Sequence, residues 1–268
     1  MPALAPAVAR SPVPTPTPSD DAVTPTIPPA LADADQLAAA DFWEASTLDP
    51  SRAAGLRARV AAWDGGPSGV HPLVGSGPVV PLRPVRDRVQ RLLAERRSGR
   101  TFAGPALAHR QVERLLAAVG PTPDGRRTVP EAGGIDAVHA YAVLARVDGP
   151  LAGTVVRYDH RRHAVQVVAA APGPDALRDA FRVEDETLPQ AVVVLVVDVD
   201  AVARKYGARG TRFALQQVGH AAQNLSLRLA ADGLTGYVLG AALDHDVLDL
   251  LGVAHTGVRY GGAVACGR

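Results

Sequence analysis

The segment Gln190–Val199 constrains the fold most, because valine and leucine fill most of it. A strand with one face in water alternates apolar and polar residues, whereas a strand covered on both faces is apolar throughout. The segment therefore predicts a strand at the centre of a sheet.

Other β-rich runs lie on both sides of this segment. They span residues 137–147, 154–159, 164–169, 236–242 and 256–265. Valine-rich stretches bounded by Gly, Pro and Asp are typical of strands, and the polar tip His160–His163 between the second and third runs predicts a hairpin.

Helical patterns occupy much of the remaining chain. They span residues 35–44, 51–63, about 85–97, 109–119, 175–185 and 211–231. The last is the longest, and its apolar stripe is Leu215, Val218, Ala222, Leu225 and Leu229. Gly233 supplies a left-handed C-cap for it. A short helix with Asp244 as N-cap precedes the final strand. The layout is α+β.

The N-terminal region differs in composition from the rest. Met1–Pro29 alternates Pro with small residues. Proline fits neither the interior of a helix nor the hydrogen-bonding pattern of a β-sheet. We expect a disordered tail over residues 1–33, a helical extension over 34–82, and one domain over 83–268.

Composition excludes several classes of function. The net charge of +1 and the few scattered aromatic residues argue against a nucleic-acid partner. No apolar run is long enough to span a bilayer, and one cysteine, Cys266, excludes a disulfide framework or a Cys-based metal cluster. We expect a cytoplasmic protein without a metal. Neither a GxGxxG after a strand nor a P-loop motif is present.

The chain has one lysine, Lys205, among 28 basic residues, and one asparagine, Asn224, on the following predicted helix. A lysine can lose its proton near neutral pH when burial or a neighbouring cation favours the neutral amine, whereas an arginine stays charged. Lys205 is therefore a candidate acid/base or oriented donor, and chance survival on a solvated loop is the alternative.

Two further motifs are suited to a ligand. Arg96-Arg97-Ser98-Gly99-Arg100 follows a predicted helix and offers guanidinium groups, a hydroxyl and backbone N–H groups for a phosphate. The alternative to phosphate binding is that these arginines stay in solvent and only complement the helix dipole. The turn Pro130-Glu131-Ala132-Gly133 has small residues that let the backbone approach a flat ligand.

In order and spacing these motifs resemble the nitroreductase-like flavoproteins, and among them the SagB-type oxidases, which convert azolines to azoles in ribosomal peptide natural products. The similarity covers about residues 85–262. The matching segments are Arg96–Phe102, Pro130–Gly133, Tyr158-Asp159, Lys205–Arg212, Gly219–Leu225, Gly233-Leu234, and Gly240 before Asp244.

The resemblance implies a nitroreductase-like α+β fold, with a mostly antiparallel central sheet flanked by helices, in an interlocked homodimer with FMN at the subunit interface. It also implies Lys205 and Tyr206 as the catalytic pair. The implied cofactor-binding residues are Arg96, Arg97, Ser98, Arg100, Pro130, Glu131, Ala132, Gly133, Gln223, Asn224 and Gly240.

Glu131 departs from the family pattern, which usually has Ser after this Pro. A carboxylate disfavours a reduced, anionic flavin beside it, so Glu131 points away, stays protonated, or marks altered chemistry. His220 is a donor to the flavin or a packing residue. Gln223 and Asn224 bond a flavin edge or the partner subunit, or their amides have a packing role. We interpret Asp244, Asp246 and Asp249 as helix capping rather than a metal site.

The function implied by the resemblance is dehydrogenation of thiazoline or oxazoline rings in a precursor peptide, with a cyclodehydratase as partner. FMN accepts the hydride, dioxygen reoxidises it, and Lys205 or Tyr206 is the base. One alternative is an FMN-dependent NAD(P)H oxidoreductase acting on another natural-product intermediate. Another is a non-catalytic scaffold subunit of a peptide-modifying synthetase complex.

Overall fold

The computed structural model describes residues 29–62 and 80–268, so most of the predicted tail and of the Gly/Pro loop before Pro81 lies outside the described residues. Its centre is a six-stranded sheet with the order β3-β2-β1-β4-β6-β5. The strands are β1 (Val138–Leu144), β2 (Thr154–Asp159), β3 (Ala164–Ala170), β4 (Ala191–Val197), β5 (Thr235–Leu239) and β6 (Arg259–Gly267). Neighbouring strands all pair antiparallel.

The apolar segment predicted to form the centre of the sheet is β4, and it pairs with β1 on one side and β6 on the other. All seven of its residues are buried. Val193 and Leu195 face one hydrophobic core, and Val192 and Val194 face the other. Both faces of β4 are therefore covered, as the sequence predicts.

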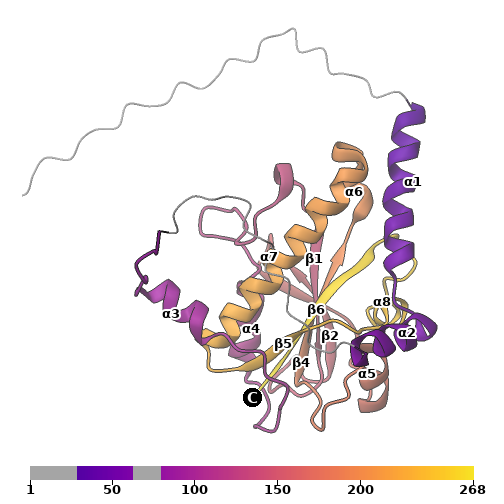
Figure 1. The fold of residues 1–268 in the computed structure, drawn as a ribbon. Helices are drawn as coiled ribbons and strands as arrows, with labels where there is room; N and C mark the ends of the chain where they lie inside the picture. The colour runs from indigo at the N-terminus through magenta and orange to yellow at the C-terminus, as the bar shows by residue number, and fades with distance from the viewer. Residues whose placement is uncertain (1–28, 63–79) are drawn as a thin grey trace, which may run out of the picture.

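Helices cover both faces of the sheet (Figure 1). They are α1 (Pro29–Ser46), α2 (Pro50–Ala61), α3 (Arg88–Glu95), α4 (His109–Ala117), α5 (Pro174–Phe181), α6 (Val199–Tyr206), α7 (Gly210–Ala231) and α8 (Asp244–Leu250). Short 3-10 turns are η1 (Ala132–Gly134) and η2 (Gly207–Arg209). The helix α7 crosses one face diagonally, with α6 at its N-terminal end and α3 and α4 beside its C-terminal half.

The first two helices pack against the C-terminal half of the chain. The backbone N–H of Leu48, between α1 and α2, donates to the Asp244 carboxylate at 3.0 Å, and Asp244 N–H donates back to the Leu48 carbonyl at 3.2 Å. Arg57 of α2 contacts Glu184 at 3.5 Å. These contacts bring α2 beside the end of β5.

The structure corrects three sequence predictions. Asp244 is the first residue of α8 rather than its N-cap, which is Leu243, and its carboxylate holds Leu48 instead. Leu215 of α7 is 37% exposed, because the buried stripe runs through Ala214 and Ala221. The helix α6, capped by Asp198, was not predicted, and it moves Lys205 from a loop onto a helix.

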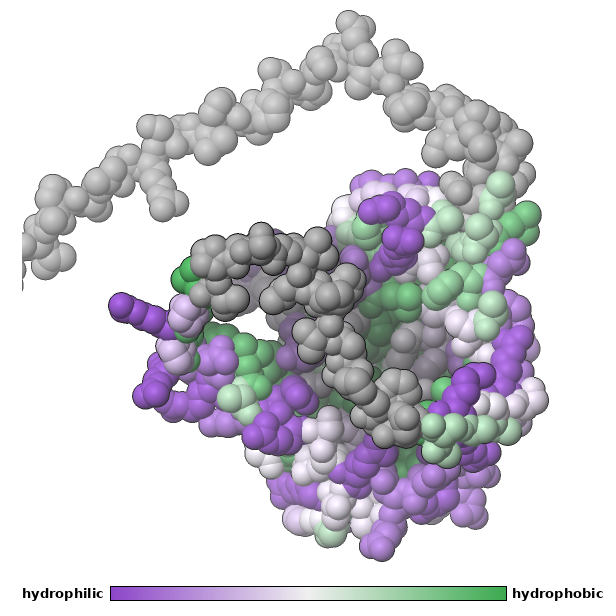
Figure 2. Space-filling view, in the orientation of Figure 1, coloured by the Kyte–Doolittle hydropathy of each residue, from purple (hydrophilic) through white to green (hydrophobic). Residues whose placement is uncertain are grey.

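The helix α3 has no buried residue among its eight. Apolar side chains on and beside it, Val85, Val89 and Leu93, are exposed. Figure 2 shows hydrophobic residues gathered on α3 and along α1 on the same face. An amphipathic helix whose apolar side faces water commonly marks an interaction surface.

Candidate functional site

The arginine-rich loop 96–100 lies against the start of β5. The N–H of Gly99 donates to the Gly236 carbonyl at 3.1 Å, and a side chain at Gly99 would collide with Thr235. Beside this loop is a cleft of about 360 Å³, which we call the arginine cleft. Its lining includes Arg96, Arg97, Ser98, Gln223, Ser226, Gly233, Tyr237 and Val238.

The guanidinium groups of Arg96, Arg97 and Arg100 form no ion pair within the described part of the chain. Arg97 donates to the Ala94 carbonyl at the end of α3, at 3.0 Å. Unpaired guanidinium groups beside the Ser98 hydroxyl suit an anion such as a phosphate.

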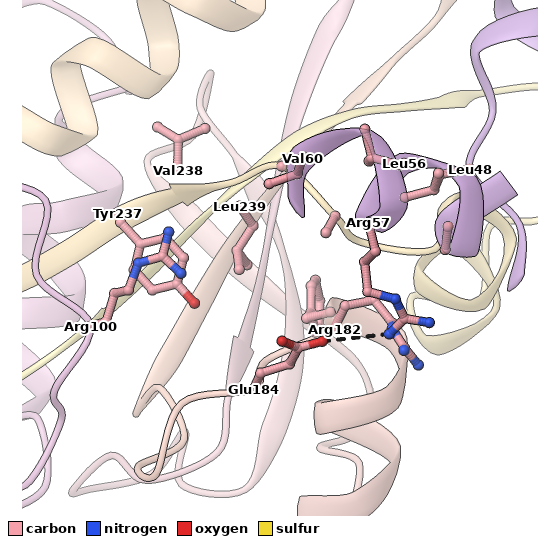
Figure 3. Close-up of a pocket in the computed structure, with 14 residues that line it drawn as sticks. Leu48, Leu56, Arg57, Val60, Arg100, Arg182, Glu184, Tyr237, Val238 and Leu239 are labelled. Carbon is pink, nitrogen blue, oxygen red and sulfur yellow. Dashed lines mark hydrogen bonds and ion pairs between the residues drawn. The ribbon is translucent and has the colours of Figure 1, made fainter. Parts of the chain in front are cut away.

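A second cleft of about 430 Å³ adjoins the first and shares Tyr237 and Val238 with it (Figure 3). We call it the apolar cleft. Arg100 and Gly240 line it, and α2 contributes Leu56, Arg57 and Val60 as a wall. Leu48, Phe181 and Leu239 add further apolar surface.

Tyr237 fixes the side chain of Arg100 between the two clefts. The Arg100 guanidinium lies 4.5 Å from the centre of the Tyr237 ring, which is a cation–π distance. The Tyr237 hydroxyl donates to Asp185 at 2.9 Å. Burial, together with the neighbouring Asp185 carboxylate, raises the pKa of Tyr237 to about 12, so it stays a neutral donor.

Lys205 and Tyr206 lie on the last turn of α6, beyond the N-terminal end of α7. The Lys205 amine donates to the Gly133 carbonyl at 3.3 Å and lies 5.5 Å from the Tyr206 ring. Phe213 contacts the Tyr206 ring edge-on at 4.9 Å. Lys205 is exposed and borders neither cleft.

Gly133 lies in close contact with both Lys205 and Tyr206. Its φ of 59° belongs to the left-handed region, and an added Cβ would lie 2.7 Å from Lys205 Nζ and collide with the Tyr206 hydroxyl. The absence of a side chain at Gly133 therefore permits the close contact.

Glu131 pairs with an arginine on the neighbouring hairpin. Its carboxylate accepts from Arg127 Nη1 at 3.0 Å, and the same nitrogen lies 3.0 Å from Asp136. The Glu131 side chain is thus directed toward Arg127.

The other residues predicted from the sequence have different surroundings. Asn224 donates its amide to the Ala118 and Thr128 carbonyls at 3.2 and 3.1 Å, which is a structural contact. Gln223 is exposed and lines the arginine cleft. His220 is exposed, and Pro130 and Ala132 lie near Glu131.

The predicted residues therefore form two groups at opposite ends of α7. One group contains Lys205 and the turn at Gly133, and the other contains the arginine loop with Gln223. From Gly210 to Gln223 the helix rises roughly 20 Å at 1.5 Å per residue. One copy of the chain does not bring its own two groups together.

The two adjoining clefts fit a ligand with an anionic end and a flat apolar end. The arginine cleft supplies cations and a hydroxyl, and the apolar cleft supplies Leu56, Val60 and Leu239 beside Arg100. A flavin mononucleotide has both parts, so the donor set suits this cofactor.

Within the described residues, no cluster of His, Cys, Asp and Glu could hold a metal ion. No helix in residues 29–62 and 80–268 is long and apolar enough to cross a bilayer.

Comparisons with known proteins agree with this fold. The model of the nitroreductase family matches residues 93–268. A protein of Methanocaldococcus jannaschii that bears a nitroreductase name is 29% identical over 167 residues, covering 61% of this chain and 84% of the relative.

Two solved structures share the fold. A chain of the Escherichia coli microcin synthetase complex McbBCD, with truncated pro-MccB17 bound, superimposes with a TM-score of 0.67 at 22% identity, covering 91% of this chain and 94% of that one. A Ralstonia eutropha protein described as a nitroreductase gives a TM-score of 0.58 at 21% identity, over 71% and 87% of the two chains.

Proposed function

The chain belongs to the nitroreductase family of flavin-dependent oxidoreductases, and on this premise we propose that it uses FMN to dehydrogenate azoline rings in a modified precursor peptide. The observation that carries the proposal is that the chain has both two adjoining clefts suited to a flavin and, apart from them, a lysine–tyrosine pair suited to proton transfer.

We place the FMN phosphate in the arginine cleft, against Arg96, Arg97 and Ser98. Arg100 and Gly240 of the apolar cleft would then hold the flat ring system. When bound, FMN supplies the hydride acceptor for the dehydrogenation. Leu56 and Val60 of α2 would add apolar surface beside the ring.

We propose that each active site combines residues of two copies of the chain. The arginine loop of one copy meets the Lys205–Tyr206 pair of the other, because α7 keeps these groups apart within one copy. Val89 and Leu93, one turn apart on α3, are exposed apolar side chains that support a homodimer.

Lys205 and Tyr206 act on the proton that leaves the azoline ring. As the ring becomes aromatic, one ring carbon loses a proton and its neighbour loses a hydride. Either the Lys205 amine takes the proton, or the Tyr206 phenolate takes it while the Lys205 ammonium stabilises that phenolate. The Gly133 carbonyl orients Lys205 in both cases.

The peptide substrate and the cyclodehydratase partner are proposed from the fold shared with a chain of the microcin synthetase complex, which holds a truncated pro-MccB17. That similarity covers 91% of this chain, which is more than the family match over residues 93–268. We propose that residues 34–82 form a helical extension of the FMN-binding domain 83–268.

The test is conversion of a peptide that already carries thiazolines or oxazolines. We expect the purified protein with FMN and dioxygen to remove two hydrogens per ring, seen as a 2 Da loss by mass spectrometry, without NAD(P)H. Lys205→Ala and Lys205→Arg should both lose turnover while the flavin absorption band is retained.

Three results would contradict this proposal in different ways. NAD(P)H-dependent reduction with no loss of hydrogen from azolines points to the other flavin chemistry. A colourless protein that takes up no added FMN points to a scaffold subunit. Full activity of Lys205→Arg refutes a proton-accepting role for Lys205.

A further inference from the structure

Arg127 lies in a short hairpin before the turn that carries Gly133, and its guanidinium is turned inward. The side chain is only 7% exposed. Its Nη1 lies 3.1 Å from the Val138 carbonyl, and its Nη2 donates to the Val119 carbonyl at 3.3 Å. Removing a guanidinium from water is costly, and the contacts of Nη1 and Nη2 offset part of this cost, whereas Nε has no hydrogen-bond partner within the described residues.

The same guanidinium holds both sides of the turn. Nη1 contacts Glu131, which precedes Gly133, and Asp136, which follows it, at 3.0 Å each. Asp136 also faces His160 at 3.4 Å and Arg161 at 3.5 Å. The short segment between Glu131 and Asp136 is thus fixed at both ends by Arg127.

This turn is what positions the lysine–tyrosine pair. Lys205 is an exposed side chain with four rotatable bonds, and the Gly133 carbonyl is its hydrogen-bond acceptor. The bare Cα of Gly133 also leaves room for the Tyr206 hydroxyl. A shift of the turn would therefore move both side chains.

We propose that Arg127 and Glu131 are positioning residues, whose partly buried ion pair fixes the Gly133 turn and thereby orients Lys205 and Tyr206. Neither residue touches the substrate in this role. The placement of Lys205 follows from the fold itself, whereas its catalytic consequence rests on the proposed function.

The single lysine allows a direct test without flavin or substrate. Protein grown with carbon-13 lysine gives one Cε signal in a proton–carbon NMR spectrum, and Lys205→Arg confirms its origin by losing it. We expect Glu131→Gln to move this signal. Arg126→Gln, whose arginine is 81% exposed and pairs with Asp124, is the matched control and should leave it unchanged.

Glu131→Gln is the principal variant because it keeps the Arg127–Asp136 pair and the shape of the side chain. Arg127→Gln leaves two carboxylates without their cation, and it serves as a second variant where it folds. An unmoved lysine signal in folded Glu131→Gln overturns the proposal, whatever reaction the protein catalyses.

Kinetics test the consequence separately. We expect Glu131→Gln to lower kcat about tenfold or more with little change in KM, because small misplacements of reacting groups are costly. An unchanged kcat in folded Glu131→Gln contradicts a role through Lys205, and inactivity of the wild type contradicts the proposed function alone.

Discussion

The Lys205 amine lies 3.3 Å from the Gly133 carbonyl, so a residue far away in the sequence holds the chain's one lysine in place. The turn that presents this carbonyl is fixed by a partly buried ion pair between Arg127 and Glu131. This arrangement explains how an exposed lysine keeps a defined orientation.

Gly133→Ala should reduce turnover at least tenfold while the fold and flavin binding persist. A Cβ at this position lies 2.7 Å from Lys205 Nζ and displaces it. Gly134→Ala is the matched control, because Gly134 has a φ of 71° but nothing within 4 Å of its added Cβ. Both variants bear a backbone cost of about 1–2 kcal/mol. Equal activity of the two variants would contradict the claim that Gly133 must lack a side chain to position Lys205 and Tyr206.

Arg97→Gln should weaken FMN binding about 10- to 100-fold, because a hydrogen bond to a charged group contributes about 1.5–3 kcal/mol. Arg88→Gln on the first turn of α3 is the control. Titration of the FMN-free protein, followed by quenching of flavin fluorescence, measures both affinities. Unchanged affinity in Arg97→Gln would contradict a phosphate in the arginine cleft.

Leu225→Ala should destabilise the protein by about 2–5 kcal/mol, because the side chain is fully buried in the core beneath α7. Leu215→Ala on the same helix should cost less than about 1 kcal/mol in the free chain, since Leu215 is 37% exposed. Denaturant unfolding monitored by circular dichroism compares them. The reverse order would contradict the register of α7.

Tyr237→Phe should change the dependence of stability on high pH. Burial and the Asp185 carboxylate raise the pKa of Tyr237 from 10.0 to about 12, so the Tyr237 hydroxyl stays protonated to a higher pH in the folded state than in the unfolded state. The stability due to this shift is complete below pH 10 and is lost as pH rises toward 12, by about 1.4 kcal/mol per unit. Denaturant unfolding between pH 9 and 12 should give a shallower decline for Tyr237→Phe than for the wild type, and parallel curves would contradict the shift.

The sheet was largely predictable because its strands carry strong local patterns. The unbroken run in β4 predicts a central strand, and the polar tip between β2 and β3 predicts a hairpin. The helix α6 was missed because Val199 continues the apolar run of β4. The cap residue Asp198 is the signal that could have identified the start of α6.

Features that depend on contacts distant in sequence were not predictable. Asp244 resembles an N-cap, yet its partner is Leu48, and only the tertiary fold shows this. The burial of Ala214 and Ala221 in place of Leu215 depends on how α7 faces the sheet. Arg127 was overlooked because adjacent arginines in a Pro/Gly loop usually face water.

The placement of the candidate site was predicted only in parts. The sequence identifies the arginine loop and the lysine–tyrosine pair, but not that α7 separates them. Their separation is a property of helix length and packing. It leads to the central claim that two copies of the chain complete each site.

Mixed dimers test this claim most directly. Lys205→Ala and Arg97→Ala chains, carrying different affinity tags, are co-expressed and purified through both tags. They are then assayed for azoline oxidation at an FMN concentration too low to occupy the Arg97→Ala dimer. A site built from two copies predicts that each mixed dimer has one intact site and about half the wild-type activity, although both parent dimers lack that activity. Mixed dimers as inactive as their parents would contradict the shared site.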